Sequence, residues 1–309
     1  MNNNTKSLPV VTVIIPTIGR PDYIVDTVRS VLAQSYLHLQ ILISDNAPEV
    51  ATKSLLRAAS INDPRIEIIQ HTKRLEFSDH MNKCIALSNG EYLMILSDDD
   101  QIAPSYVADM VAFMLSNNNI KICFGNQIRI DENCLGLFPV KYEQSPLKIF
   151  DGLDFLIGSL SGTLTTNIMT YVSMFVRRTD IIEVGGFRPY PDGSHADNFV
   201  VLSLALRGLV ALGGGTMFYR VYLASFGLRT PFSALLSATN AYTNEALALT
   251  SKAPIKIYQR KILDNLIKRT NARMLLSRIR AVYRFRLSIF ELLICLLRTL
   301  QFRFGLYKR

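Results

Sequence analysis

The sequence predicts an α/β fold, with a mainly parallel sheet flanked by helices and a helical, basic C-terminal extension. Short apolar runs alternate with helical patterns through roughly the first hundred of the 309 residues. Several of these runs stop at loops that contain acidic residues. Hydrophobic residues make up 49% of the chain and charged residues only 19%, which allows a substantial core and argues against extensive disorder.

The first strand is expected at residues 10–15, a β-branched run that stops at the loop Pro16–Pro21. Pro21 suits the first turn of a helix. The apolar residues of this expected helix recur at helical spacing: Ile24, Val28, Val31 and Leu32. A second strand is expected at residues 39–43, where an apolar run ends at Ser44 and Asp45. The second expected strand therefore ends at an acid.

The next elements continue the alternation. A helix is expected at residues 49–59, a strand at 66–69, a helix at 78–87 and a strand at 92–96, which leads into Asp98, Asp99 and Asp100. This βαβα order predicts a parallel sheet with right-handed crossovers. The loop after the first strand, Asp45 and the three aspartates should then lie on one rim of the sheet.

The residue types on that rim suit a nucleotide diphosphate. Ligands of open α/β sheets bind outside the carboxyl ends of the strands, and clustered carboxylates bind Mg²⁺ or Mn²⁺ through oxygen. Asp45 can accept a hydrogen bond from a base or ribose, and the loop Pro16–Arg20 can lie along the nucleoside. The alternative is that Asp45 is a turn residue and that the aspartates solvate a loop before the helix that Pro104 opens.

Four segments, taken together and in order, resemble the family 2 glycosyltransferases, whose nucleotide-sugar-binding fold is called GT-A. These segments are Val11–Thr17, Val28–Tyr36, Ser44–Asn46 and Gly90–Asp100. The resemblance covers roughly residues 10 to 225. It implies a GT-A catalytic domain at 10–230. A flexible N-terminus is expected before it at 1–9, and the pattern after it predicts a helical, basic region at 231–309 that associates with a membrane or packs on protein.

The resemblance also assigns roles to individual residues. It implies nucleotide-sugar contacts from Pro16, Thr17, Arg20, Asp45 and Asp98, and binding of Mn²⁺ or Mg²⁺ by Asp99 and Asp100. The family's acidic motif often has the pattern Asp-x-Asp-Asp, and here Ser97 occupies its first acidic place. Tyr222 stands where the family often has a histidine, so a third metal ligand is not identified.

A later segment supplies a candidate general base. Gly185-Gly186-Phe187 followed by Ala196-Asp197 resembles the family's Gly-Gly-Phe…Glu-Asp segment, which implies that Asp197 removes the proton from the attacking acceptor hydroxyl. From the residues alone, the favoured interpretation of Asp197 is an acid that stabilises a helix N-terminus, and His195 is interpreted as a polar residue at the rim and not as a ligand. The chain has no tryptophan, which excludes the Gln-x-x-Arg-Trp motif of processive synthases and favours single addition.

The C-terminal residues 252–309 are strongly basic. They hold 15 Lys and Arg against two acids, a net charge of +13, whereas the rest of the chain has 19 basic and 23 acidic residues, a net charge of −4. The apolar stretch Leu287–Leu297 is too short to span a bilayer and fits a helix in the membrane interface, where basic residues meet anionic lipids. The alternative is packing on the catalytic domain or on a second subunit. No recognised nucleic-acid-binding fold accompanies the basic region.

The resemblance thus implies a metal-dependent inverting glycosyltransferase that moves one sugar from a nucleotide-diphosphate donor to a glycan hydroxyl. Among such donors, a UDP-sugar is the one expected. The expected acceptor is lipid-linked, as in surface polysaccharide synthesis of the O-antigen or capsule type. Four scattered cysteines and a polar N-terminus predict a cytoplasmic protein, and the basic tail predicts a peripheral position on the inner face of the cell membrane. A homo-oligomer is left open. The rival hypothesis is a non-catalytic nucleotide-sugar-binding or scaffold protein that recruits partners through its basic tail.

Overall fold

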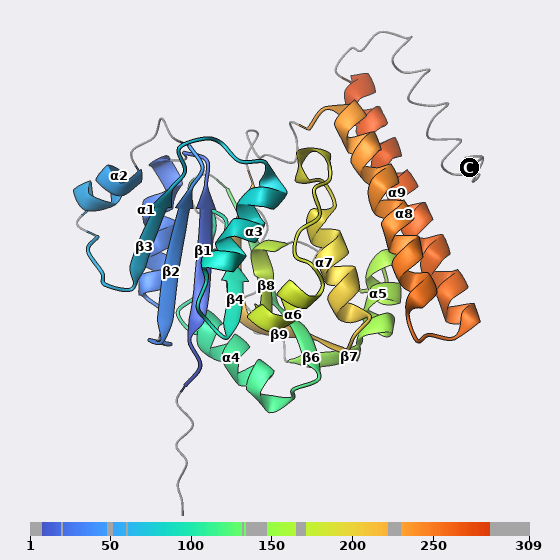
Figure 1. Cartoon of the computed structure of the whole chain (residues 1–309), viewed down its shortest axis with the longest axis horizontal. Coiled ribbons are helices and arrows are strands. Elements are labelled where there is room, and N and C mark those ends of the chain that lie inside the picture. Colours follow the sequence, from blue (N-terminus) through green and yellow to red (C-terminus); the bar gives the residue numbers. More distant parts are fainter. Residues whose placement is uncertain are drawn as a thin grey trace, which may run out of the picture.

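The fold is α/β, as predicted, with one sheet flanked by helices (Figure 1). The computed structural model describes residues 8–19, 21–47, 52–59, 61–131, 133, 147–164, 171–221 and 230–284. Within these ranges the strands form a nine-stranded sheet in the order β3-β2-β1-β4-β8-β6-β9-β5, with β7 paired to β9.

The first four strands form a parallel unit. They are β1 (Val11–Thr17), β2 (Leu39–Asp45), β3 (Ile66–Gln70) and β4 (Tyr92–Ile95), and β1 lies between β2 and β4. The intervening helices are α1 (Pro21–Leu32), α2 (Thr52–Ala58) and α3 (Phe77–Leu87). The parallel arrangement predicted for the first hundred residues is therefore confirmed, and their strand ends meet at one edge.

The second half of the sheet is mixed rather than mainly parallel. Strand β8 (Met174–Arg177) lies antiparallel between β4 and β6 (Ile120–Ile130), and β6 pairs in parallel with β9 (Leu209–Arg220). Strands β5 (Gln101–Ile102) and β7 (Lys148–Asp151) pair antiparallel with β9. This part of the pairing joins strands from distant parts of the chain, and the alternation of local patterns does not predict it.

Both faces of the sheet are covered. The helices here are α4 (Tyr106–Ser116), α5 (Gly152–Ser161), α6 (Arg178–Glu183) and α7 (Ala196–Ala205), with the 3₁₀ turns η1 (Tyr171–Ser173) and η2 (Pro191–Gly193). Successive strand residues point to opposite faces and enter two separate buried clusters. Phe124 stacks on Phe155 on one face, and Tyr92 stacks on Phe175 on the other. Burial on both faces explains why the strands are continuous apolar runs.

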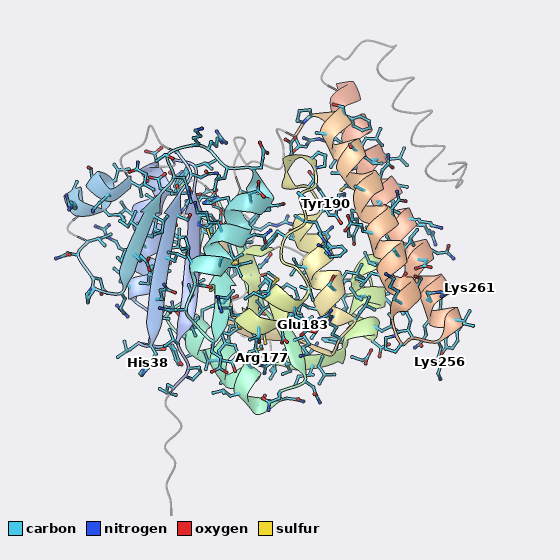
Figure 2. The ribbon with its side chains drawn as sticks, viewed as in Figure 1. His38, Arg177, Glu183, Tyr190, Lys256 and Lys261 are labelled. Carbon is cyan, nitrogen blue, oxygen red and sulfur yellow. The ribbon has the colours of Figure 1, made fainter. Side chains whose placement is uncertain are left out.

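The described part of the C-terminal extension is helical, as predicted. Helices α8 (Phe232–Lys252) and α9 (Ile257–Arg284) form a pair beside α5 and α7 (Figure 1). Tyr242 of α8 and Leu263 of α9 belong to the same buried cluster as residues of the sheet, whereas Lys256 and Lys261 are exposed (Figure 2). These helices thus pack on the α/β unit.

Two expectations for the extension are not tested by these helices. The domain boundary at residue 230 stays a prediction, and the segment Leu287–Leu297 lies outside the described residues. Among the helices of the described ranges, none is both long enough and apolar enough to cross a membrane.

The close packing of α5 on α7 gives a test of this architecture. A Cβ atom on Gly152 would lie 1.7 Å from the Ala205 carbonyl oxygen and 2.4 Å from that of Gly208. Gly152→Ala must therefore push the two helices apart, and we expect a loss of about 3 kcal/mol in the free energy of unfolding, measured by urea denaturation.

Gly162→Ala is the matched control, because Gly162 ends the same helix and a Cβ atom there would meet no atom of the described residues within 4 Å. Its φ of 81° still strains an alanine, which should cost about 1 kcal/mol. Equal losses in the two variants would contradict the close approach of α5 to α7.

Candidate functional site

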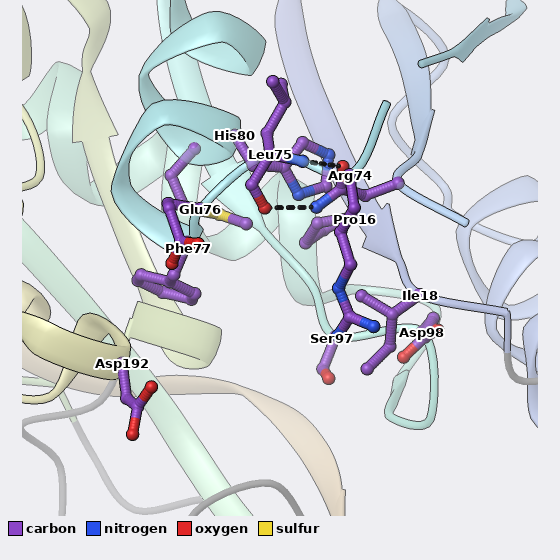
Figure 3. A pocket seen from close by; sticks show the side chains of 12 residues that line it. Pro16, Ile18, Arg74, Leu75, Glu76, Phe77, His80, Ser97, Asp98 and Asp192 are labelled. Carbon is purple, nitrogen blue, oxygen red and sulfur yellow. Dashed lines mark hydrogen bonds between the residues drawn. The ribbon is translucent and has the colours of Figure 1, made fainter. Parts of the chain in front are cut away.

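A pocket of about 380 Å³ opens where the carboxyl ends of β1, β2 and β4 face the start of α3 (Figure 3). Four segments and one further residue line it: Pro16 and Ile18 at the end of β1, Asn46 after β2, Arg74–Phe77 with His80 and Met81 at α3, Ser97 and Asp98 after β4, and Asp192 from η2. The pocket therefore lies at the sheet edge where the sequence predicts a ligand site.

The segment before α3 is tied to the end of β2 by a pair of hydrogen bonds. Asn46 Nδ2 donates to the Leu75 carbonyl at 2.9 Å, and the Leu75 amide donates to Asn46 Oδ1 at 2.8 Å (dashed in Figure 3). This places the Arg74 side chain in the pocket, where it supplies a positive charge. The sequence analysis missed Arg74 because an isolated arginine in a loop carries no signal of its own.

The turn that carries the three aspartates is held from two sides. Thr27 of α1 donates its hydroxyl hydrogen to the carbonyls of Asp98 and Asp100, at 3.0 and 2.8 Å. Arg220, the last residue of β9, donates from its backbone N to Asp100 Oδ1 at 2.8 Å and from Nε to the Asp99 carbonyl at 2.9 Å. The turn thus joins elements from both halves of the sheet.

The carboxylates of this turn fit a divalent cation. Asp100 is fully buried, and among the residues that the structure describes its Oδ2 has no hydrogen-bond partner. Burial and then the neighbouring charge of Asp99 raise the pKa of Asp100 well above its ordinary value. A hard cation satisfies such an orphaned oxygen, and Mg²⁺ commonly combines one or two carboxylates with substrate phosphates. In the ranges that the structure describes, no three or more His, Cys, Asp or Glu side chains form a metal cluster.

The residues predicted to bind the nucleotide sugar lie in different places. Pro16 and Asp98 line the pocket, and Thr17 Oγ1 donates to Asp98 Oδ2 at 2.5 Å. Asp45, at the end of β2, is buried and does not line the pocket; its Oδ1 accepts from the Ala47 amide at 3.0 Å. Arg20 lies outside the described residues. Of these five residues, the structure therefore gathers Pro16, Thr17 and Asp98 directly.

A chain of hydrogen bonds runs from the exposed Lys83 to the buried residues His71, Ser44 and His80, and it supports the pocket wall. Lys83 Nζ donates to His71 Nδ1 at 3.4 Å, so His71 donates from Nε2 to Ser44 Oγ at 2.9 Å. Ser44 then donates to His80 Nε2 at 2.8 Å, which leaves the His80 hydrogen on Nδ1. Burial lowers the pKa of His80 to about 4, so the His80 ring is neutral near pH 7. The sequence analysis missed the group because its members come from separate segments.

Asp197, the predicted base, lies in the first turn of α7. It is half-buried, and its Oδ1 accepts from the Asn198 amide at 2.9 Å. It is not among the residues that line the pocket, whereas Asp192 of the preceding turn is. His195, which the sequence analysis interprets as a rim residue, is instead buried, with 6% of its surface exposed.

Comparison with known proteins gives a family match. The family model described as Glycosyl transferase family 2 matches residues 12–175. TuaG of Bacillus subtilis, named for teichuronic acid biosynthesis, is 30% identical over 37% of this chain and 45% of its own length. A Campylobacter jejuni enzyme named GalNAc(5)-diNAcBac-PP-undecaprenol beta-1,3-glucosyltransferase is 25% identical over 38% of each chain. The chain therefore matches less than half the length of these relatives.

A solved structure shows the same fold over almost the whole chain. Staphylococcus aureus TarS, residues 1–349, covers 95% of this chain and 80% of its own with a TM-score of 0.68 and 12% identity. The structure of TarS residues 1–349 in complex with UDP-GlcNAc covers 95% of this chain and 81% of its own, with a TM-score of 0.67 and 11% identity. This likeness concerns the fold and includes the C-terminal helices within the span that it covers.

The neutral state of His80 predicts how stability depends on pH. Unfolding returns His80 to a pKa near 6.5, so the unfolded chain binds a proton that the folded chain excludes between about pH 6.5 and pH 4. The free energy of unfolding should fall as the pH is lowered through this window, and His80→Gln should reduce that slope by up to about 1.4 kcal/mol per pH unit. Urea denaturation at several pH values measures how the free energy of unfolding changes with pH.

His38→Gln is the control, because His38 is exposed at the opposite end of the sheet (Figure 2). It should leave the slope unchanged. An unaltered slope in His80→Gln would show that His80 is not held neutral in the folded protein.

Proposed function

The chain belongs to glycosyl transferase family 2, and we propose from this premise that it moves one sugar from a nucleotide-diphosphate donor to a glycan hydroxyl. The observation that carries the proposal is a single pocket, which joins the loop after β1, the end of β2 and the aspartate turn after β4. Residues 10–230 form the catalytic domain in this proposal, and residues 231–309 form its extension.

The donor is a UDP-sugar. A protein of similar fold, TarS, is described in complex with UDP-GlcNAc, which supports this nucleotide. The loop Pro16–Arg20 lies along the nucleoside, with Thr17 holding Asp98 toward the ribose or sugar, and Asp45 accepts a hydrogen bond from the base. Arg74 lies in the same pocket and offers the diphosphate a positive charge.

A divalent cation, Mn²⁺ or Mg²⁺, is held by Asp99 and Asp100 together with the donor phosphates. The orphaned Oδ2 of Asp100 supports this assignment. When bound, the cation offsets negative charge that develops on the nucleoside diphosphate as it leaves.

Asp197 is the general base. An acceptor hydroxyl is a weak nucleophile until its proton is removed, and a carboxylate at the start of α7 can take that proton as the oxygen attacks the anomeric carbon. The bond to the diphosphate breaks on the opposite side, so the configuration at the anomeric carbon inverts.

The acceptor is a lipid-linked glycan used in surface polysaccharide synthesis. The names of the teichuronic acid and undecaprenol-linked relatives support this class of acceptor. The net charge of +13 over residues 252–309 supports a peripheral position on the inner face of the cell membrane, where basic residues are attracted to anionic lipids.

Asp197→Asn tests the proposed base. We expect kcat for sugar transfer to fall about 100- to 10,000-fold, because Asn cannot accept the acceptor proton, while the Kd for the UDP-sugar is unchanged. Asp154→Asn is the control, since Asp154 is an exposed acid in the first turn of α5. Turnover at the wild-type rate in Asp197→Asn would refute the base, and donor binding without any turnover in the wild type would favour a scaffold.

Asp99→Ala tests the cation site. For the wild type, a UDP-sugar at about 100 times its Kd should stabilise the fold by about 2.7 kcal/mol, and a chelator should remove this effect. In Asp99→Ala the Tm should no longer respond to Mn²⁺ with donor. Asp22→Ala, which removes an exposed acid from α1, should respond as the wild type does. Chelator-resistant stabilisation of the wild type would contradict metal dependence.

A further inference from the structure

The backbone just before α7 has an unusual conformation. His195 has a φ of 67° and is one of two non-glycine residues with positive φ in the described ranges. A left-handed conformation is unfavourable for most residues, so it persists only where surrounding contacts hold it. His195 is also the N-cap residue of α7, but its side chain does not cap the helix. Its side-chain contacts must therefore be sought elsewhere.

Those contacts come from α8 in the C-terminal extension. The His195 ring stacks on Tyr242, with 4.8 Å between ring centroids and an interplanar angle of 4°. His195 Nε2 lies 3.0 Å from Thr239 Oγ1. Tyr190, just before η2, packs against Tyr242 as well, at 6.3 Å between centroids (Figure 2). Helix α8 thus contacts the chain on both sides of η2.

The hydrogen bonds define one tautomer of His195. The Thr239 hydroxyl donates its single hydrogen to the Leu235 carbonyl at 2.6 Å, so it accepts from His195 Nε2. His195 Nδ1 is then the acceptor for Asn198 Nδ2 at 3.2 Å. The ring therefore links α8 to a residue in the first turn of α7.

The burial of Thr239 and His195 and the charge of Asp197 are consistent with contact between α8 and the start of α7. Thr239 is fully buried, and burial lowers the pKa of His195 to about 4, so the ring is neutral near pH 7. The pKa of Tyr242 is raised by burial and then by the negative charge of Asp197. The carboxylate of Asp197 is thus close enough to α8 for its charge to act on Tyr242.

We infer that α8, through Thr239 and His195, holds the first turn of α7 and thereby sets the position of the Asp197 carboxylate. This inference rests on the proposed function, in which Asp197 is the general base. His195 and Thr239 are positioning residues: they act through Asp197 and not on the substrate. The extension then takes part in catalysis in addition to any contact it makes with a membrane.

Three substitutions on α8 separate positioning from stability. Thr239→Val removes the acceptor for His195 with little change in volume, whereas Thr239→Ser keeps a hydroxyl. Thr243→Val is the matched control one turn along the helix: Thr243 Oγ1 donates to the Thr239 carbonyl at 2.7 Å and accepts from Asn271 Nδ2 at 2.8 Å. It therefore loses the same kinds of bond without a contact to His195.

For Thr239→Val we expect kcat for transfer to fall about 10- to 100-fold, with the KM for the UDP-sugar within about twofold of the wild type, because a misplaced base slows only the chemical step. Thr239→Ser should restore kcat, and Thr243→Val should retain it even where its Tm falls. Amide hydrogen exchange over residues 193–199 should accelerate in Thr239→Val and not in Thr243→Val.

The outcomes distinguish this inference from the proposed function. Wild-type exchange and kcat in Thr239→Val, or an equal loss of kcat in Thr243→Val, would overturn the inference. Faster exchange in Thr239→Val with unchanged kcat would also overturn it. If the wild type transfers no sugar from any donor, the proposed function fails, and the exchange comparison still decides whether α8 holds the first turn of α7.

Discussion

The geometry of the site depends on the junction between Asp100 and Arg220. Asp100 follows β4 in the parallel half of the sheet, and Arg220 ends β9 in the mixed half. Because the buried Asp100 carboxylate accepts from the Arg220 backbone and the Arg220 side chain donates to the Asp99 carbonyl, the two halves meet at this turn. Arg220 also lies over the Tyr23 ring of α1, 4.5 Å from its centroid, so the junction extends to the first helix.

The opposite wall of the pocket is held by hydrogen bonds between polar side chains. Asn46 holds the segment before α3, and the chain from Lys83 through His71 and Ser44 to His80 lies behind it. Its buried members, His71, Ser44 and His80, are joined by hydrogen bonds with defined donors and acceptors, which makes this wall rigid. The charged groups that line the pocket, including Arg74 and Asp98, thus lie against a wall of defined shape.

The C-terminal helices belong to the same folded body as the sheet. Tyr242 and Ala246 of α8 are buried in the cluster that contains Ile14 and Phe124, and Thr239 of the same helix holds His195. The basic residues of the extension, such as Lys256 and Lys261, remain on its outside. One face of these helices therefore packs on the sheet and its covering helices, and the other carries exposed basic residues.

The sequence by itself determined the parallel half of the fold and its functional edge. The apolar runs of β1, β2 and β4 and their polar ends are local patterns, and alternation with helices leaves one parallel arrangement. It also placed Pro16 and Asp98 at the edge where the pocket opens, because the carboxyl ends of parallel strands meet at one edge. Only the tertiary structure decided the antiparallel insertion of β8, the role of Arg220 and the burial of His195 under α8. These features depend on contacts between residues that are far apart in the sequence, such as His195 with Thr239, 44 positions away, and Arg220 with Asp99, 121 positions away. A local pattern shows that a residue is buried, but it does not show which distant residue covers it.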